Sequence, residues 1–321
     1  MVDDNDRLER PIPETALRTN LKGVFTLGPP PAGFDPSTAS NALLRKYGLP
    51  QRPNPDKNPL AWRAWKQAVS RPLGEFIHPV FEPLPWPRAP KPDPVSVWNA
   101  NTWAGGELPG NWQSVWGTWT VPTVTLPANP GSQSLFACSA WVGIDTSPDV
   151  LQVGTAQQIN STGATFYGPW FEWFLQEPNI ENSPTQQTVK KLTVNVNDVV
   201  QVQLAYAPTI NQGSCIFSNF TTGKWTSFYI PNVGGATFTG NTIEWIVEAP
   251  VVQVTSSSTP VAATLPQFGS VTFTDCGGCS TDKLTEGDPQ QGSGLNIEDA
   301  NGNPLTSVSA APGTVTVTQL S

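Results

Sequence analysis

The sequence predicts an all-β protein, a two-sheet antiparallel β-sandwich preceded by a proline-rich extension with short helices. From about residue 99 onward, apolar and polar side chains alternate with a period of two in many short segments. Clusters of Gly, Pro, Asn and Ser separate these segments, and no convincing amphipathic helix follows residue 100. Many short strands with such punctuation are typical of sandwiches. We therefore divide the chain into an extension, residues 1–98, and a β-domain, residues 99–321.

Two helices are predicted in the extension. The first covers residues 41–47 and ends at Gly48. The second begins at Asn58-Pro59, a capping residue followed by proline at the first helical position. Its apolar side chains share one face: Leu60, Ala61, Ala64, Trp65, Ala68 and Val69. Residues 79–94 are rich in proline and predict an extended connector.

The β-domain contains at least ten segments with strand character. They are residues 115–121, 135–144, 170–174, 192–196, 200–206, 214–218, 225–230, 243–248, 271–274 and 314–318. Successive side chains of a strand point to opposite faces, so Glu172 shares a face with Trp170 and Phe174. By the same rule Glu244 lies on the same face as Glu248. Carboxylates among aromatic side chains are costly to bury unless they are partnered or line a cleft.

Charge is divided unevenly along the chain. Residues 1–98 hold 13 of the 17 Lys and Arg and 10 acidic residues, a balance of +3, whereas residues 99–321 hold four Lys and 15 acidic residues, a balance of −11. The net charge of −8 argues against nucleic acid as a partner, and no apolar run is long enough to span a membrane. We expect a monomer.

The β-domain contains neither arginine nor histidine, because the single histidine is His78. A Ser-His-Asp or Cys-His arrangement and a His-ligated metal site are therefore excluded within it. No phosphate-binding glycine loop appears either, and we expect no cofactor and no metal. Carboxylates and amides remain as the groups that could carry proton transfer and charge stabilisation. An acidic domain without arginine suits low pH, where protonation reduces its charge.

Several stretches of the β-domain resemble the glutamic peptidases, or eqolisins, typified by the scytalidoglutamic and aspergilloglutamic peptidases. They occur in the family's order over residues 99–320. The stretches are Trp103-Ala-Gly-Gly, Gly117-Thr-Trp-Thr-Val-Pro, Ala140-Trp-Val-Gly-Ile-Asp, Leu151-Gln-Val-Gly, Trp170-Phe-Glu-Trp-Phe, Asn219-Phe-Thr-Thr-Gly, Glu244-Trp-Ile-Val-Glu and Phe273-Thr-Asp.

The resemblance implies a concanavalin-like sandwich, a jelly roll, and acid endopeptidase activity on protein or peptide substrates by a glutamine–glutamate dyad. Carried over by motif, the glutamine is Gln152 and the glutamate is Glu248. Such a dyad suits peptide hydrolysis, since a carboxyl group can take a proton from water and return it to the leaving amine. The neutral amide of the glutamine can donate an N–H to the developing oxyanion.

The resemblance also implies residues around the dyad. Trp141 and Asp145 match supporting or cleft positions, and Trp170 and Glu172 match positions that line the substrate groove. Two residues depart from the fungal pattern: Gly168 replaces an aspartate, and Phe174 replaces a tyrosine. These departures bear on subsite preference and leave the dyad unchanged.

Two other functions fit the same residues. Paired glutamates in an aromatic groove would also serve a glycoside hydrolase. A non-catalytic carbohydrate-binding sandwich is the other alternative. Gln152 favours the peptidase, because a glycosidase does not need an amide in that position.

The four cysteines allow several states. The spacing of Cys276 and Cys279 favours a local disulfide, with free thiols as the alternative. A zinc site would also need Cys138 and Cys215, which lie on distant strands.

The role of the extension is open between two readings. A basic propeptide could cover an acidic cleft near neutral pH and leave on acidification, with self-cleavage near residues 85–100. Alternatively, the extension packs on the domain through its tryptophan-bearing helix. The resemblance implies a secreted protein, yet the first 30 residues contain no basic and apolar secretory signal, so localisation stays open.

Overall fold

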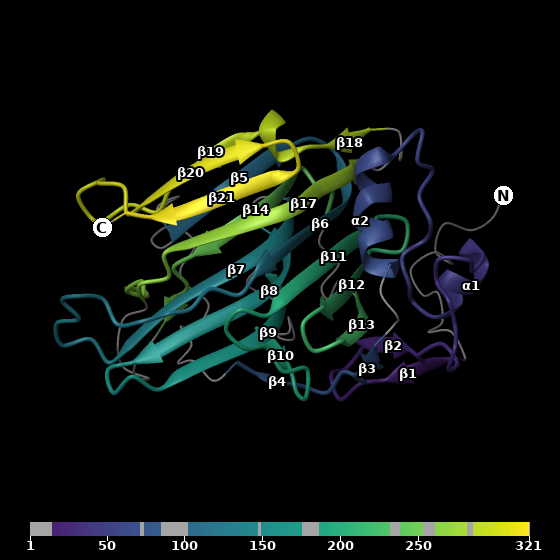
Figure 1. Ribbon diagram of the computed structural model, residues 1–321, viewed down its shortest axis with the longest axis horizontal. Helices are drawn as coiled ribbons and strands as arrows, with labels where there is room; N and C mark the ends of the chain where they lie inside the picture. The colour runs from purple at the N-terminus through teal and green to yellow at the C-terminus, as the bar shows by residue number, and fades with distance from the viewer. Residues whose placement is uncertain are drawn as a thin grey trace.

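The computed structural model describes residues 15–70, 74–84, 102–146, 149–174, 186–231, 238–252, 261–280 and 285–320. Two large sheets stack face to face, and helices occur mainly near the N-terminus (Figure 1). The described strand pairs are antiparallel, except for one short parallel pair. The predicted all-β sandwich with a helix-bearing extension is therefore confirmed.

Both predicted helices form, as α1 (Asn41–Lys46) and α2 (Pro59–Val69). The described residues also contain a 3-10 turn that was not predicted, η3 (Pro289–Gln291). The Ser40 hydroxyl accepts a hydrogen bond from the Leu43 amide and caps α1. Proline at the first position of α2 has the fixed φ that a helix start needs. Within α2, Ala64 and Trp65 are buried, so its predicted apolar face is the face that packs.

The first sheet has eleven strands. Its main order is β1-β2-β13-β12-β11-β6-β17-β21-β20, with β3 paired to β13 and β18 paired to β17. The bounds are β1 (Ala16–Arg18), β2 (Phe25–Leu27), β3 (Glu75–Phe76), β6 (Trp112–Thr120), β11 (Val199–Ala207), β12 (Gln212–Asn219), β13 (Lys224–Pro231), β17 (Ser270–Ser280), β18 (Glu286–Gly287), β20 (Thr306–Ala311) and β21 (Thr314–Gln319).

The second sheet has eight strands in the order β19-β5-β14-β7-β8-β9-β10-β4. The bounds are β4 (Phe81–Pro83), β5 (Trp103–Pro109), β7 (Leu135–Thr146), β8 (Asp149–Asn160), β9 (Thr165–Phe174), β10 (Gln187–Val189), β14 (Thr242–Glu248) and β19 (Ser293–Leu295). A small separate ribbon pairs β15 (Val251–Val252) with β16 (Val261–Ala262).

Alternation along the central strands separates two faces of the eight-stranded sheet. Val142, Val153 and Trp245 belong to the hydrophobic core between the sheets. The neighbouring residues point away from the eleven-stranded sheet and form a second apolar cluster that includes Trp141 and Trp170. We call this second surface the outer face. The predicted sharing of faces along these strands is confirmed.

One strand predicted from the sequence does not form. Residues 192–196 lie in a turn-bearing connection, although Leu192 and Val194 are buried in the core. The Asp198 carboxylate accepts a hydrogen bond from the Asn195 amide, and Asn197 adopts a φ of 65°. Side-chain bonding to the backbone and a left-handed residue favour a turn over a strand. The apolar alternation here reflects two core contacts and no strand pairing.

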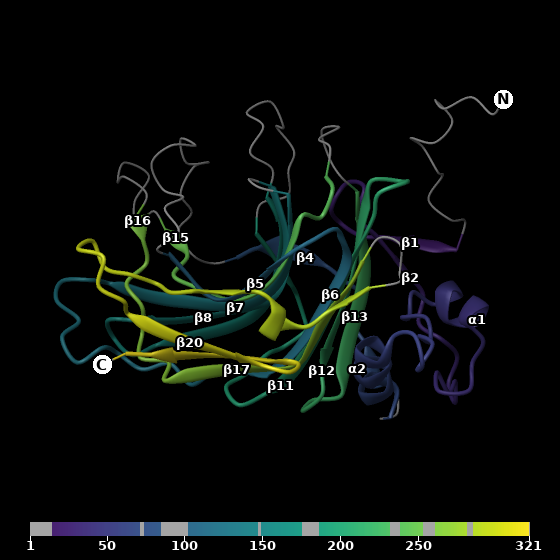
Figure 2. The same cartoon turned by 90° about the horizontal axis from the view of Figure 1, so that it is seen from above.

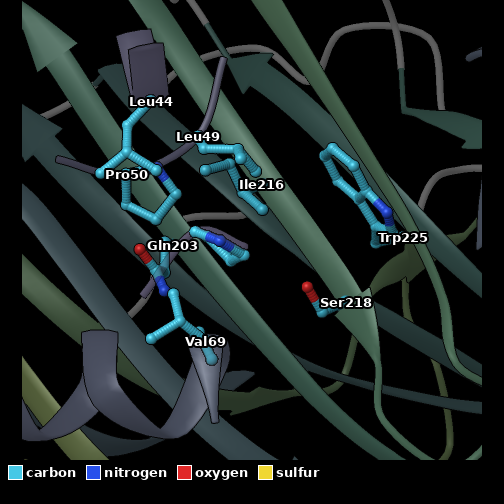
Figure 3. Close-up of a pocket in the computed structure, with 10 residues that line it drawn as sticks. Leu44, Leu49, Pro50, Val69, Gln203, Ile216, Ser218 and Trp225 are labelled. Carbon is cyan, nitrogen blue, oxygen red and sulfur yellow. The ribbon is translucent and has the colours of Figure 1, made fainter. Parts of the chain in front are cut away.

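The extension packs on the outside of the eleven-stranded sheet. Leu44 of α1 and Trp65 of α2 form a buried cluster with Trp225 of β13. Figure 2 places α1 and α2 beside β12 and β13, on the side of the molecule away from β5, β7 and β8. Side chains of both partners surround a cavity of about 30 Å³, enough for roughly one water molecule (Figure 3).

Within the described ranges, no helix is long and apolar enough to cross a lipid bilayer.

The packing of α1 leads to a stability prediction. Leu44 is fully buried, whereas its neighbour Leu43 is 44% exposed. We expect Leu44→Ala to lower the free energy of unfolding by about 2–5 kcal/mol, because it leaves a cavity. Leu43→Ala is the matched control and should change it by about 0.5 kcal/mol or less. Urea unfolding measures both, and equal effects of the two substitutions would contradict the packing.

Candidate active site

The predicted site residues lie on the outer face of four adjacent strands, β14, β7, β8 and β9. Gln152 of β8 is directly opposite Glu172 of β9 and opposite Gly143 of β7. On its other side, Gly143 is opposite Glu244 of β14. Glu244, Gln152 and Glu172 thus form one row across the sheet, in which the only residue without a side chain is Gly143.

Glu248 lies four residues further along β14, opposite Ser139. Its Oε2 accepts hydrogen bonds from the Trp141 indole Nε1 at 3.0 Å and from the Ser139 hydroxyl at 3.4 Å. The Trp103 side chain of β5 also acts on this carboxyl group and favours its charged form. The Trp103 and Trp141 rings meet edge to face at 5.0 Å, which fixes both indoles. Glu248 is therefore buried and held by neutral donors.

The environment of Glu248 changes its proton affinity. Burial raises the pKa of Glu248 to about 7, and the negative charge of Glu172 acts in the same direction. The Trp103 side chain and the hydrogen bonds from Trp141 and Ser139 oppose this rise, because they stabilise the carboxylate. At acid pH the group is consequently a neutral carboxylic acid.

Gln152 is 4% exposed and has one described hydrogen bond. Its Nε2 donates to Oε2 of Glu172 at 3.3 Å. Its Oε1 is buried and has no hydrogen-bond partner among the described residues. On the same face, the indole Nε1 of Trp170 is also buried and has no hydrogen-bond partner in the described part of the chain. Buried polar atoms without partners are rare in folded proteins and indicate a place for water or ligand.

Gln152 and Glu248 do not hydrogen-bond to each other directly. β7 separates their strands, and Trp141 of β7 lies in the row between theirs. Glu172 links the two groups, since it accepts from Gln152 and its charge acts on Glu248. The arrangement sets a buried acid, a neutral amide and an aromatic side chain on one face of the sheet.

A second carboxyl cluster adjoins this site. Glu107 of β5 is opposite Glu244, and Asp145 forms a side-chain hydrogen bond with Glu244. Burial raises the pKa of Glu244 well above its usual range, and the charges of Asp145, Glu107 and Glu248 raise it further. Burial also raises the pKa of Glu107. The raised pKa values favour the protonated forms of Glu244 and Glu107.

The structure brings most of the predicted residues together. Trp141, Trp170, Glu172 and Gln152 share the outer face, and Asp145 contacts Glu244 beside them. The backbone of Phe174 pairs with Val150, but its side chain lies outside the described residues.

Trp141 was predicted to support the site, but two other side chains beside Glu248 were not. Ser139 and Trp103 reach this carboxyl group from the strands that flank β14. Only the strand register brings them there, and no local pattern in the sequence encodes it. The motif around Trp103 was the one available signal.

The predicted disulfide between Cys276 and Cys279 is wrong. The two residues do not form a disulfide, and they lie in β17, where residues 277–279 pair with consecutive residues of β6. Three residues of extended chain span about 10 Å, which exceeds the Cα distance that a disulfide bridges. Within the described ranges, no group of three His, Cys, Asp or Glu side chains is arranged to hold a metal ion.

Known proteins match the chain at the level of family and fold. The model of the peptidase A4 family matches residues 101–319. The chain is similar to a scytalido-glutamic peptidase solved with a transition-state analogue inhibitor, with 23% identity and a TM-score of 0.56, covering 68% of this chain and 98% of that one. It is also similar to SCP-B of the eqolisin family, with 24% identity, a TM-score of 0.54 and the same coverage.

Aspergilloglutamic peptidase from Aspergillus niger is 28% identical, with a TM-score of 0.47 over 58% of this chain and 99% of that one. No curated protein sequence matches the chain significantly. The solved structures support the sandwich fold, and the family match covers more than half of the chain. The chain belongs to the peptidase A4 family, the glutamic peptidases, and is a peptide hydrolase.

Proposed function

We propose that the protein is an acid-active endopeptidase in which Gln152 and Glu248 carry the chemistry. One observation supports this assignment above the others. Glu248 is a buried carboxyl group held by indole and hydroxyl donors, on the same face as a buried glutamine amide whose oxygen has no described partner. Such a pair offers an acid or base together with a neutral dipole, which is what peptide hydrolysis needs.

The pKa of Glu248 decides the order of proton transfers. Because burial raises this pKa to about 7, the carboxyl group carries a proton in acid. In the proposed reaction it gives that proton to the nitrogen of the scissile peptide bond as water attacks the carbonyl carbon. The carboxylate so formed then takes a proton from the attacking water. The C–N bond breaks, the amine leaves with the proton that Glu248 gave, the other product is a carboxylic acid, and Glu248 is again protonated.

Gln152 is the proposed electrostatic partner. One N–H of its Nε2 donates to Glu172, so the second N–H is available for the carbonyl oxygen, which becomes negative as water adds. Its buried Oε1 can accept a hydrogen bond from the attacking water. Glu172 fixes the amide in this orientation.

The outer face also suits a peptide substrate. Trp141 and Trp170 form part of its apolar cluster, and Trp170 has a buried N–H that lacks a described partner. SCP-B was solved in complex with the tripeptide Ala-Ile-His. We propose that an extended peptide binds across this face in the present protein, with backbone groups meeting the unpartnered polar atoms.

The dyad is tested by substitution. We expect Glu248→Gln and Gln152→Ala each to lower kcat/KM on an acid-denatured protein by about 10²–10³-fold or more, since each removes a group that acts in the transition state. Digestion at about pH 4 in the presence of pepstatin separates this activity from aspartic peptidases. Near-full activity of either variant would refute the dyad.

Gln201→Ala is the matched control, because Gln201 is likewise a buried glutamine but lies on β11 of the other sheet. It should keep activity within about threefold of the parent. Hydrolysis of a β-glucan with no digestion of protein would instead support the glycoside hydrolase, and binding of a glycan without turnover would support the carbohydrate-binding module.

The raised pKa of Glu248 also predicts how stability depends on pH. The folded state holds this proton up to about pH 7, whereas an unfolded glutamate releases it near its ordinary pKa of 4.5. The contribution of this proton to the free energy of unfolding is fully present below about pH 4.5 and disappears as pH rises through about 7, a change of about 3 kcal/mol. Glu244 shifts stability in the same direction.

Urea unfolding of the parent and of Glu248→Gln at about pH 4 and about pH 7.5 measures this effect. The free energy of unfolding of the parent should fall between the two conditions, and the variant should lose less. An equal fall in both proteins would show that Glu248 is not the group responsible.

A further inference from the structure

The extension precedes the part of the chain that the family model matches, because that match begins at residue 101. We propose that this segment, described over residues 15–70 and 74–84, is a resident part of the enzyme that stays bound after the chain is cut between residues 84 and 102. It would then act as a non-covalent subunit and would not be a removable cover. This inference does not depend on the proposed chemistry of Gln152 and Glu248.

Main-chain pairing attaches the segment to both sheets. Its strand β4 pairs with β10 at the edge of the eight-stranded sheet over three residues. Its strand β3 pairs in parallel with β13 of the eleven-stranded sheet, and β2 also pairs with β13. Strand addition to an open edge satisfies backbone groups that would otherwise be unpaired.

Buried side-chain hydrogen bonds reinforce this pairing at β13. The Thr226 hydroxyl donates to the Ile77 carbonyl at 2.8 Å, and the Thr26 hydroxyl donates to the Ser227 carbonyl at 2.5 Å. The Trp225 indole donates to the Gly74 carbonyl at 3.2 Å. Release of the segment would leave buried groups of this interface without these partners.

The start of α2 is bound by a carboxylate of the β-domain. Glu286 Oε2 accepts from the Leu60 amide at 2.8 Å, and its Oε1 accepts from the Ala61 amide at 2.7 Å. Both amides belong to the first turn of the helix, where they have no partner within the helix. The β-domain therefore supplies the cap of a helix in the segment.

The segment also completes the core between the sheets. Val24, Ile77 and Phe81 belong to the same buried cluster as the central strands. The Phe81 ring meets Phe171 at 5.0 Å and Phe228 at 5.1 Å, so it bridges one strand from each sheet. Removing it would open the core to water along that edge.

The location of the helices argues against a segment that covers the candidate active site. α1 and α2 lie on the outside of the eleven-stranded sheet, beside β12 and β13 (Figure 2). Gln152 and Glu248 instead lie on the outer face of the eight-stranded sheet, with Trp141 and Trp170. At β4, Leu84 joins the outer-face cluster with Trp170 and so extends that face at its edge.

The described ion pairs also differ from those expected of a propeptide that covers the active site and is released at acid pH. Across the boundary Lys190 pairs with Glu82 at 3.3 Å, and Lys224 pairs with Glu75 at 4.0 Å. In both, the cation belongs to the β-domain and the carboxylate to the segment, the reverse of a basic propeptide on an acidic cleft. Both pairs are largely exposed and contribute little to binding. Apolar and main-chain contacts carry the interface.

The test is a full-length chain with the recognition sequence of a specific protease placed between residues 85 and 101, cut to completion as judged on a denaturing gel. We expect both fragments to co-elute in size exclusion at about pH 7 and about pH 4, in a Glu248→Gln background that prevents self-digestion. In the active background, cutting should leave kcat/KM on a peptide within about twofold. Separate elution of the N-terminal fragment from a folded β-domain would overturn the proposal.

Matched substitutions at the interface locate the contact. In the cut protein, Leu44→Ala should release the N-terminal fragment at a lower urea concentration than the parent, and Leu43→Ala should not. Release that is insensitive to Leu44→Ala would show that the fragments are held together by something other than this interface. A severalfold rise in activity on cutting would identify the segment as an inhibitor and refute its resident role.

Discussion

The burial of Glu248 among neutral donors is the constraint on which the site depends. A carboxylate removed from water must gain a cation, gain donors or become protonated. The β-domain contains no arginine and no histidine, so a nearby cationic partner of those types is unavailable to it. Indole and hydroxyl groups supply partial compensation, and the remaining cost appears as a pKa near neutrality. The unusual composition of the domain and the proton affinity of its candidate catalytic group therefore have one physical origin.

That environment depends on strand register. Trp141 reaches Glu248 because β7 pairs with β14 in a register that sets Ser139 opposite Glu248. A shift of this register by one residue would turn Ser139 and Trp141 from the outer face into the core. Gly143 has a similar role, since a Cβ there would lie 2.7 Å from the Trp141 ring and 3.3 Å from Glu244 Oε2. A side chain at this position would displace both neighbours.

Local patterns were sufficient for the parts of the structure that local physics determines. Alternation predicted which face holds Glu172 and Glu248, and the proline at residue 59 predicted where α2 begins. Contacts between segments that are distant in the sequence could not be predicted from local patterns. Ser139 meets Glu248 across a strand pair whose register is set by the whole sheet, and the apolar residues at 192 and 194 are core contacts in a turn. The Cys276–Cys279 spacing suggested a bridge that an extended strand cannot form.

The proline-rich end of the extension also could not be predicted from local pattern alone, and its position in the sheet explains the structural role of the extension. Proline cannot donate to a strand pair, so proline content near residue 83 favoured a connector. Yet β4 is the edge strand of its sheet, where one side needs no partner, and there Pro83 is tolerated opposite Gln187. An edge strand that ends in proline also blocks further strand addition. The segment thus occupies the exposed edge beside β10 and presents a poor template to other chains, which is the behaviour expected of a permanent boundary of the sandwich.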